Sequence, residues 1–199
     1  MKKLMLAAVG LTGLLAGCGS FGGAPDGSGN ARVVGISTEY QLAGTGQSVG
    51  CDAVTNPTDI TRATSTQVVV TFAAAGSIST VDVALKGTSS SQYDESQSFN
   101  VSQLGRDASG NYQVVFDFKS ASGDFLPASI IVNPTPPAIR SPRSVTATDA
   151  VGAFYADLRV NTTTSSSFTI TSANLGSGTG KINVYRSCTL SGTAQPLTR

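Results

Sequence analysis

Apolar and polar residues alternate along most of the chain after residue 32, in short runs separated by Gly, Ser, Asn and Asp. A period of two is typical of strands that bury one face and expose the other. The clearest runs cover residues 68–72 and 81–86, where valine, leucine and phenylalanine occupy every second position. The pattern predicts about ten short strands and no helix of useful length.

Two turn signals predict how four of these strands pair. Ala-Ala-Gly-Ser at 74–77 predicts a hairpin between the runs at 68–72 and 81–86. Asp-Ala-Ser-Gly-Asn at 107–111 predicts a second hairpin, between a strand at Phe99 and Val101 and a strand over 112–118. Further strands are expected at 33–37, 130–132, 144–148, 154–160, 168–171 and 181–185. An antiparallel β-sandwich is the predicted fold.

The last expected strand carries a conflict. If Ile182 and Val184 point inward, strict alternation also sends Arg186 and Cys188 inward. A buried arginine without a partner is costly. We therefore expect either that the strand ends near Tyr185 or that a bulge intervenes.

Before the alternating region, the chain begins as an export signal does. Lys2 and Lys3 precede an apolar stretch from Leu4 to Leu15, which is followed by small residues. The stretch is too short to span a bilayer, which needs roughly 20 apolar residues. We therefore expect residues 1–17 to be removed as a signal peptide.

The exit from this segment reads Leu15-Ala16-Gly17-Cys18 and resembles the lipobox of bacterial lipoproteins. The resemblance implies diacylglycerol transfer to Cys18, cleavage before it and acylation of the new amino group; more than one acyl chain anchors a protein stably to a membrane. Gly19 follows, in place of the aspartate that retains some lipoproteins in the inner membrane, so the resemblance implies the outer membrane. The alternative is an ordinary signal peptide with an incidental cysteine.

Residues 18–31 are rich in Gly, Ser, Pro and Asp and show no periodicity. This composition predicts a flexible tether. Residues 32–199 would then form a single β-sandwich domain. Five prolines between Pro127 and Pro142 could divide it in two, but the part after them has only 57 residues and carries Cys188, so one unit is favoured.

With Cys18 assigned to lipid, Cys51 and Cys188 remain. An even pair in an exported protein predicts one disulfide, and two free thiols are the alternative. The bridge would hold the start and the end of the folded region side by side.

Composition argues against several function classes. The 13 Lys and Arg residues, two of them in the signal segment, are balanced by 12 Asp and Glu residues, which disfavours nucleic-acid binding. The chain has no histidine, so Ser-His-Asp and Cys-His catalysis are excluded and no metal or other cofactor site is expected. We expect Asp107, Ser109 and Asn111 to form a turn and not a calcium loop, because no glutamate closes the site.

The run Gly110-Asn111-Tyr112-Gln113-Val114 is loosely similar to a Gly-x-Tyr-x-Val strand of immunoglobulin-like and fibronectin-type bacterial domains. We therefore expect a non-enzymatic envelope lipoprotein that presents an immunoglobulin-like sandwich to an envelope protein partner. The alternative is a small-ligand or glycan-binding module, because exposed tyrosines can stack on sugar rings. The candidate tyrosines are Tyr40, Tyr93, Tyr155 and Tyr185.

Overall fold

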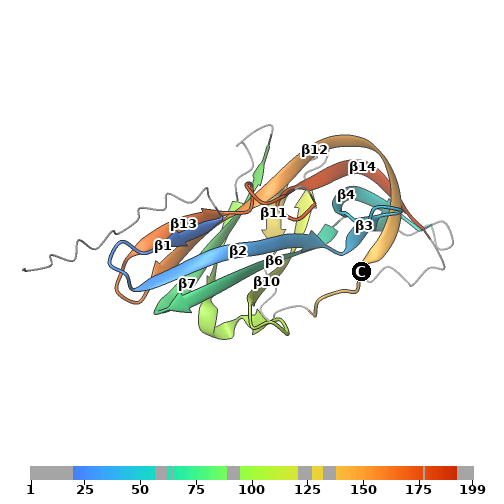
Figure 1. Ribbon diagram of the computed structural model, residues 1–199. Coiled ribbons are helices and arrows are strands. Elements are labelled where there is room, and N and C mark those ends of the chain that lie inside the picture. Colours follow the sequence, from blue (N-terminus) through green and yellow to red (C-terminus); the bar gives the residue numbers. More distant parts are fainter. Residues whose placement is uncertain are drawn as a thin grey trace, which may run out of the picture.

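The computed structural model describes residues 20–56, 62–63, 65–88, 95–120, 127–131, 138–176 and 178–191. Most of these residues lie in β-strands, which are arranged in two sheets (Figure 1). One short 3₁₀ turn, Val101–Gln103, is the exception to strands and loops in this part of the chain.

The six-stranded sheet, here called sheet A, has the order β1-β2-β6-β10-β11, with β9 also paired to β10. Its strands are β1 (Phe21–Gly23), β2 (Gly29–Thr38), β6 (Ser65–Gly76), β9 (Gly105–Arg106), β10 (Tyr112–Ser120) and β11 (Pro127–Ile131).

The eight-stranded sheet, sheet B, has the order β14-β4-β3-β12-β7-β8, with β13 paired to β12 and β5 to β4. It is mixed, because β14 runs parallel to β4 and β3 runs parallel to β12. Its strands are β3 (Tyr40–Leu42), β4 (Ser48–Thr55), β5 (Arg62–Ala63), β7 (Ile78–Gly87), β8 (Glu95–Asn100), β12 (Arg143–Thr162), β13 (Ser167–Thr171) and β14 (Ile182–Leu190).

The main core lies between the two sheets. The alternating apolar positions of β6, β7 and β12 meet there, and Phe72, Phe116, Phe154 and Leu158 are completely buried. The sequence pattern therefore identified the inward faces correctly. Removing this apolar surface from water is the main favourable term in folding such a domain.

The hairpin predicted at 74–77 is wrong. β6 pairs with β2 and β10 in sheet A, whereas β7 pairs with β8 and β12 in sheet B, so this segment crosses from one sheet to the other. Gly76 allows the crossing with φ +94°, and a Cβ there would lie 2.4 Å from the carbonyl oxygen of Ser28. Alternation shows which side chains are buried, but it does not show whether the next strand lies beside or across the core.

The second predicted hairpin has the wrong partner. Residues 107–111 do form a turn, but it joins the two-residue strand β9 to β10. Phe99 lies in β8, which pairs with β7 in sheet B, and Val101 begins the 3₁₀ turn. The side chain of Asp107 shapes the turn by accepting hydrogen bonds from the backbone N–H groups of Ser109 and Asn111, both at 2.9 Å.

The strands expected at 144–148 and 154–160 are one long strand, β12, which contributes to two cores. Its second half lies in the main core, and its first half packs with β4 and β14 around a smaller core that contains Tyr40, Val145 and Leu190. Its pairing with β14 shifts register between Ala150 and Gly152.

The register shift lies opposite Tyr185, but the conflict over Arg186 is resolved in neither of the two expected ways, because β14 continues past Tyr185 and its register with β4 is unbroken. Strand β14 continues to Leu190, Cys188 is buried and Arg186 is exposed. Ile182 and Val184 belong to the main core and Cys188 and Leu190 to the smaller core, so these four share one face and Arg186 lies between the two groups. The register shift puts the extra residue in β12 and leaves the alternation of β14 unchanged.

The flexible tether predicted over residues 18–31 is wrong for the part that the structure describes. Residues 21–23 form β1 and pair with residues 30–32 of β2, and Ala24 and Ala31 are buried. A Cβ at Gly22 would lie within about 3 Å of the Phe168 and Ile170 side chains, at 3.0 and 2.9 Å, so glycine here permits close packing against β13. The composition signal for a linker was in fact a tight edge strand and turn.

Strands from both sides of the proline-rich stretch share sheet B: β12 pairs with β7 and β3, and β14 pairs with β4. The expected strand at 130–132 is seen as β11, at the edge of sheet A, where Pro127 is tolerated. Val132 and the segment 132–137 lie outside the described residues.

Candidate functional site

The N-terminal edge of the domain lies next to the expected attachment point. The signal segment and Cys18 lie outside the described residues, which begin at Ser20. Ser20 is already held by the fold, because its carbonyl oxygen accepts a hydrogen bond from the Val33 N–H at 2.7 Å. Phe21 follows opposite Arg32, and 52% of its surface is exposed. Two peptide units therefore separate Cys18 from the first residue fixed in the sheet.

A carboxylate in the β1–β2 turn joins this edge to the rest of the domain. Asp26 accepts hydrogen bonds from the Ser28 hydroxyl at 2.6 Å and from the Thr164 hydroxyl, also at 2.6 Å. Thr164 belongs to the turn between β12 and β13, so the contact links the two sheets. These hydrogen bonds, that of Ser28 foremost, hold the pKa of Asp26 well below its usual value.

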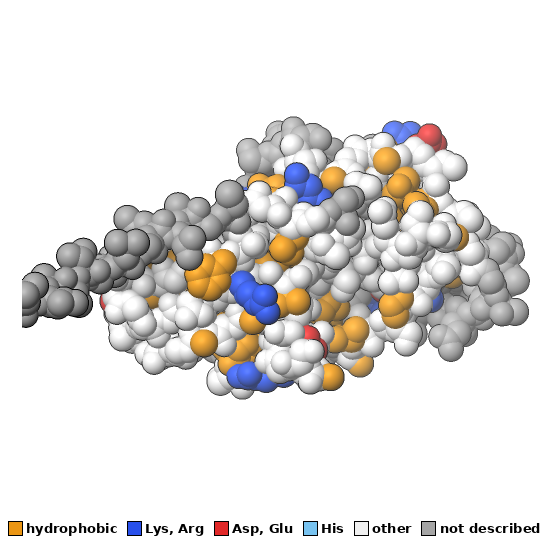
Figure 2. Space-filling model, in the orientation of Figure 1, with side chains coloured by type: hydrophobic (Ala, Val, Ile, Leu, Met, Phe, Trp, Pro, Cys, Tyr) orange, Lys and Arg blue, Asp and Glu red, His pale blue; other side chains and the backbone are white. Residues whose placement is uncertain are grey.

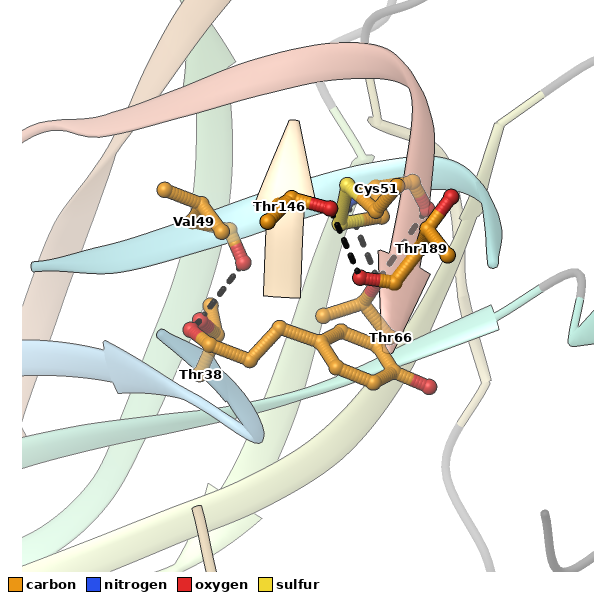
Figure 3. Close-up of a disulfide and its surroundings, with 8 residues drawn as sticks. Thr38, Val49, Cys51, Thr66, Thr146 and Thr189 are labelled. Atoms are coloured by element: carbon orange, nitrogen blue, oxygen red, sulfur yellow. Dashed lines mark hydrogen bonds between the residues drawn. A yellow bond between two sulfur atoms is a disulfide. The ribbon is translucent and has the colours of Figure 1, made fainter. Parts of the chain in front are cut away.

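The predicted Cys51–Cys188 disulfide is present (Figure 3). It joins β4 to β14 across 137 residues of sequence, with the Cα atoms 5.9 Å apart, and both cysteines are buried in the smaller core. Threonines surround it: Thr66 Oγ1 lies 3.3 Å from the Cys51 carbonyl oxygen, and Thr146 Oγ1 donates to the Thr189 carbonyl oxygen at 3.4 Å (Figure 3).

A buried cluster of charges lies where β2 ends. The carboxylate of Glu39 has no solvent exposure and accepts hydrogen bonds from Arg140 Nη1 at 2.7 Å, Arg143 Nη2 at 2.8 Å and the Gln67 N–H at 2.8 Å. Arg140 Nη1 also lies 3.3 Å from Asp117 Oδ1. Burial is the main cause that raises the pKa of Asp117, and Arg140 opposes it.

The same cluster fastens residues 138–140 to the outer side of sheet A. Gln67 Nε2 donates to the Ala138 carbonyl oxygen at 3.1 Å, and Gln67 Oε1 accepts from the Arg140 N–H at 2.7 Å. Sequence reasoning missed this cluster because Glu39 lies 101 and 104 positions from its two arginines, and no local spacing relates them.

The three candidate tyrosines that the structure describes do not form one exposed binding surface. Tyr40 is 1% exposed and packs in the smaller core, so its assignment as a surface residue is wrong. Burial, followed by the neighbouring Glu39 charge, raises the pKa of Tyr40 far above its usual value. Tyr155 lies opposite Lys86 on the outer face of sheet B, Tyr185 packs against the smaller core, and Tyr93 lies outside the described residues.

One shallow pocket of about 290 Å³ lies elsewhere, between β4, β14 and the 172–181 loop. Gln47, Ser48, Lys181 and Asn183 supply its hydrogen-bonding side chains, and Leu175 and Ala153 supply apolar surface. Of the candidate tyrosines, the three that the structure describes, Tyr40, Tyr155 and Tyr185, do not line it. The pocket can offer one cation and two amides to a small polar ligand.

Comparisons of this chain with protein-family models, with curated proteins and with solved structures find no match. In the part of the chain that the structure describes, no helix is long and apolar enough to cross a membrane. Nor do the described His, Cys, Asp and Glu side chains form a group of three or more that could hold a metal ion.

Proposed function

We propose that this protein is a cell-envelope lipoprotein, anchored through Cys18, most simply in the outer membrane. The observation that carries the proposal is the sequence order at the N-terminus: a basic start, an apolar stretch and a complete Leu-Ala-Gly-Cys box are followed within two residues by Ser20, which is fixed to β2. A fold that begins this close to the box would hold the domain near the membrane once the signal is removed. The Cys51–Cys188 disulfide supports an oxidising compartment.

We further propose that the two sheets form an immunoglobulin-like sandwich in one domain, whose role is structural or is the binding of an envelope protein. Two sheets with a shared core and several crossings between them support the sandwich class. The absence of histidine from the sequence favours a non-enzymatic role.

Acyl labelling in cells tests the anchor. The wild-type protein is expected to incorporate labelled fatty acid and to fractionate with membranes, whereas Cys18→Ala is expected to remain uncleaved or to be released unlabelled. Ser20→Ala is the matched control, because it lies next to the box and leaves it intact. Membrane association of a processed Cys18→Ala protein would refute the lipoprotein proposal. Crosslinking in intact envelopes tests the interaction role, and a failure to trap any protein neighbour counts against it.

A small-ligand or glycan-binding role is the second candidate, and the pocket at Lys181 and Asn183 is the observation that favours it. If the pocket binds an anionic sugar, Lys181→Met abolishes retention on the immobilised glycan. Lys86→Met, on the outer face of sheet B, leaves retention unchanged. Equal retention of both variants refutes a role for the pocket.

A further inference from the structure

The three large hydrophobic side chains that are most exposed in the described residues are Phe21, Val34 and Ile139, with exposures of 52%, 40% and 50%. They come from β1, β2 and the segment that follows the proline-rich stretch. Their positions in the fold show that all three lie on one side of the molecule, the outer side of sheet A.

Strand register places Phe21 and Val34 on the outer side of sheet A. Phe21 is opposite Arg32, which in turn is opposite Ala73 of β6. The neighbours of Ala73 in β6, Phe72 and Ala74, contact the core, so this row of three residues faces outward. Val34 is the extra residue at a bulge, between Val33 and Gly35, and it is exposed on the same strand.

Ile139 reaches this side by a different route. Gln67 alternates with core residues of β6, so its side chain points outward, and it hydrogen-bonds to the backbone of Ala138 and Arg140. The segment 138–140 therefore lies over the outer face of sheet A, with Ile139 exposed on top. Thr38 is the β2 residue opposite Val68, next to Gln67 in β6. It lies six residues, or about 20 Å along the strand, from Arg32. Phe21 and Ile139 thus mark two separated points of one surface.

A basic side chain is exposed beside the hydrophobic ones on the side of sheet A. On the side of sheet A, Glu39 and Asp117 are both paired with Arg140, and Arg32 is exposed. Figure 2 shows hydrophobic and basic side chains over β1 and β2, with few acidic ones on this face. The outer face of sheet B carries both signs of charge, because Asp157 pairs with Lys86 at 3.7 Å and Asp82 lies opposite Arg159.

We infer that the outer face of sheet A lies against the lipid headgroups and fixes the orientation of the domain on its membrane. The inference rests on the proposed anchor at Cys18. Two residues span at most about 7 Å, so Ser20 must stay that close to the lipidated cysteine. The headgroup layer on each side of a bilayer is roughly 5 to 7 Å thick, so Phe21 is held at its outer boundary.

The side chains exposed on sheet A favour its outer face, and not that of sheet B, as the face in contact with the membrane. Apolar side chains gain free energy by entering the interface, and an exposed arginine is attracted to anionic headgroups. On the outer face of sheet B, Asp157 pairs with Lys86 and Asp82 lies opposite Arg159, and none of the three most exposed large hydrophobic side chains lies there. The short connection to the lipid holds this face near the membrane at a high effective concentration. A contact with the headgroups that is weak by itself then binds far more tightly.

Single-tryptophan fluorescence tests the inference, because the chain has no tryptophan of its own. Phe21→Trp and Ile139→Trp report on the face of sheet A, and Tyr155→Trp is the matched control on the outer face of sheet B. Each lipidated variant is reconstituted in vesicles of phosphatidylethanolamine and phosphatidylglycerol that contain brominated phosphatidylcholine. Circular dichroism checks that each variant is folded.

We expect blue-shifted emission and severalfold stronger quenching by the brominated lipid for Ile139→Trp than for Tyr155→Trp, with Phe21→Trp quenched at least as strongly as Ile139→Trp. The additional change Arg32→Glu should reduce the quenching of Trp at position 139 to the level of the control. Equal quenching at 139 and 155, or quenching at 21 alone, overturns the inferred orientation while leaving the lipid anchor standing. A protein that carries no acyl chain overturns the anchor itself, and acyl labelling of the same preparations detects that outcome.

Discussion

Replacing Glu39 with glutamine is expected to destabilise the domain more than any change to its exposed charges. Glu39→Gln keeps the size of the side chain but removes the negative charge that faces Arg140 and Arg143. Breaking a buried ion pair by neutralising one partner costs about 3 to 5 kcal/mol. The side chains of Arg140 and Arg143 are 29% and 17% exposed and can recover some hydration, so we expect the lower end, about 3 kcal/mol.

The change is measured by thermal unfolding of the soluble domain, where about 3 kcal/mol lowers the midpoint by about 6 to 12 °C for a domain of this size. Asp157→Asn is the matched control, because Asp157 and Lys86 form a surface pair at 3.7 Å, and such pairs contribute about 0 to 1 kcal/mol. A Glu39→Gln protein that unfolds at the same temperature as Asp157→Asn would show that the buried cluster contributes nothing net to stability.

Three further predictions concern the bridge, the first turn and the crossing between sheets. Removing the disulfide by Cys51→Ala and Cys188→Ala should cost about 4 to 5 kcal/mol on the chain-entropy model for a loop of 137 residues, measured by urea unfolding; a loss below about 1 kcal/mol would contradict it. Folding lowers the pKa of Asp26, so its carboxylate stabilises the folded state at pH values above the unfolded pKa of 3.8. This stabilisation is lost as the pH falls through the lower pKa of the folded state. The midpoint difference between wild type and Asp26→Asn should therefore be largest near neutral pH and shrink on acidification, and a pH-independent difference would refute this. Gly76→Ala should destabilise the domain more than Gly110→Ala. Both glycines have a positive φ, but of the two only Gly76 would bring a Cβ within 3 Å of backbone atoms. Equal losses of stability in thermal unfolding would argue against the crossing as described.

Much of the core could be predicted from the sequence because burial on a strand depends on local parity. Val68, Phe72, Val83 and Leu158 occupy alternating positions, and each is completely buried. The disulfide could also be predicted, since once Cys18 is assigned to lipid only one pair of cysteines remains.

The candidate site was less accessible to sequence reasoning. Tyr40 was expected at the surface, but it is buried because it packs in the smaller core, with the Arg143 guanidinium over its ring. The exposed hydrophobic residues Phe21, Val34 and Ile139 come from three separate parts of the chain. Their common side is a consequence of strand register and of the contact between Gln67 and the 138–140 segment.

The sequence by itself indicated most of the core strands with their inward faces, the cysteine pair and the expected anchor, because each depends on a local pattern or on a count; it did not predict β1, β3, β4 or β5. Only the tertiary structure decided which strands are neighbours. The segment at 74–77 joins strands of different sheets, and the glycine-rich residues after Ser20 join the fold as an edge strand. Both outcomes depend on packing between segments distant in sequence, and a local pattern of hydrophobic positions contains no information about the partner against which each face is buried.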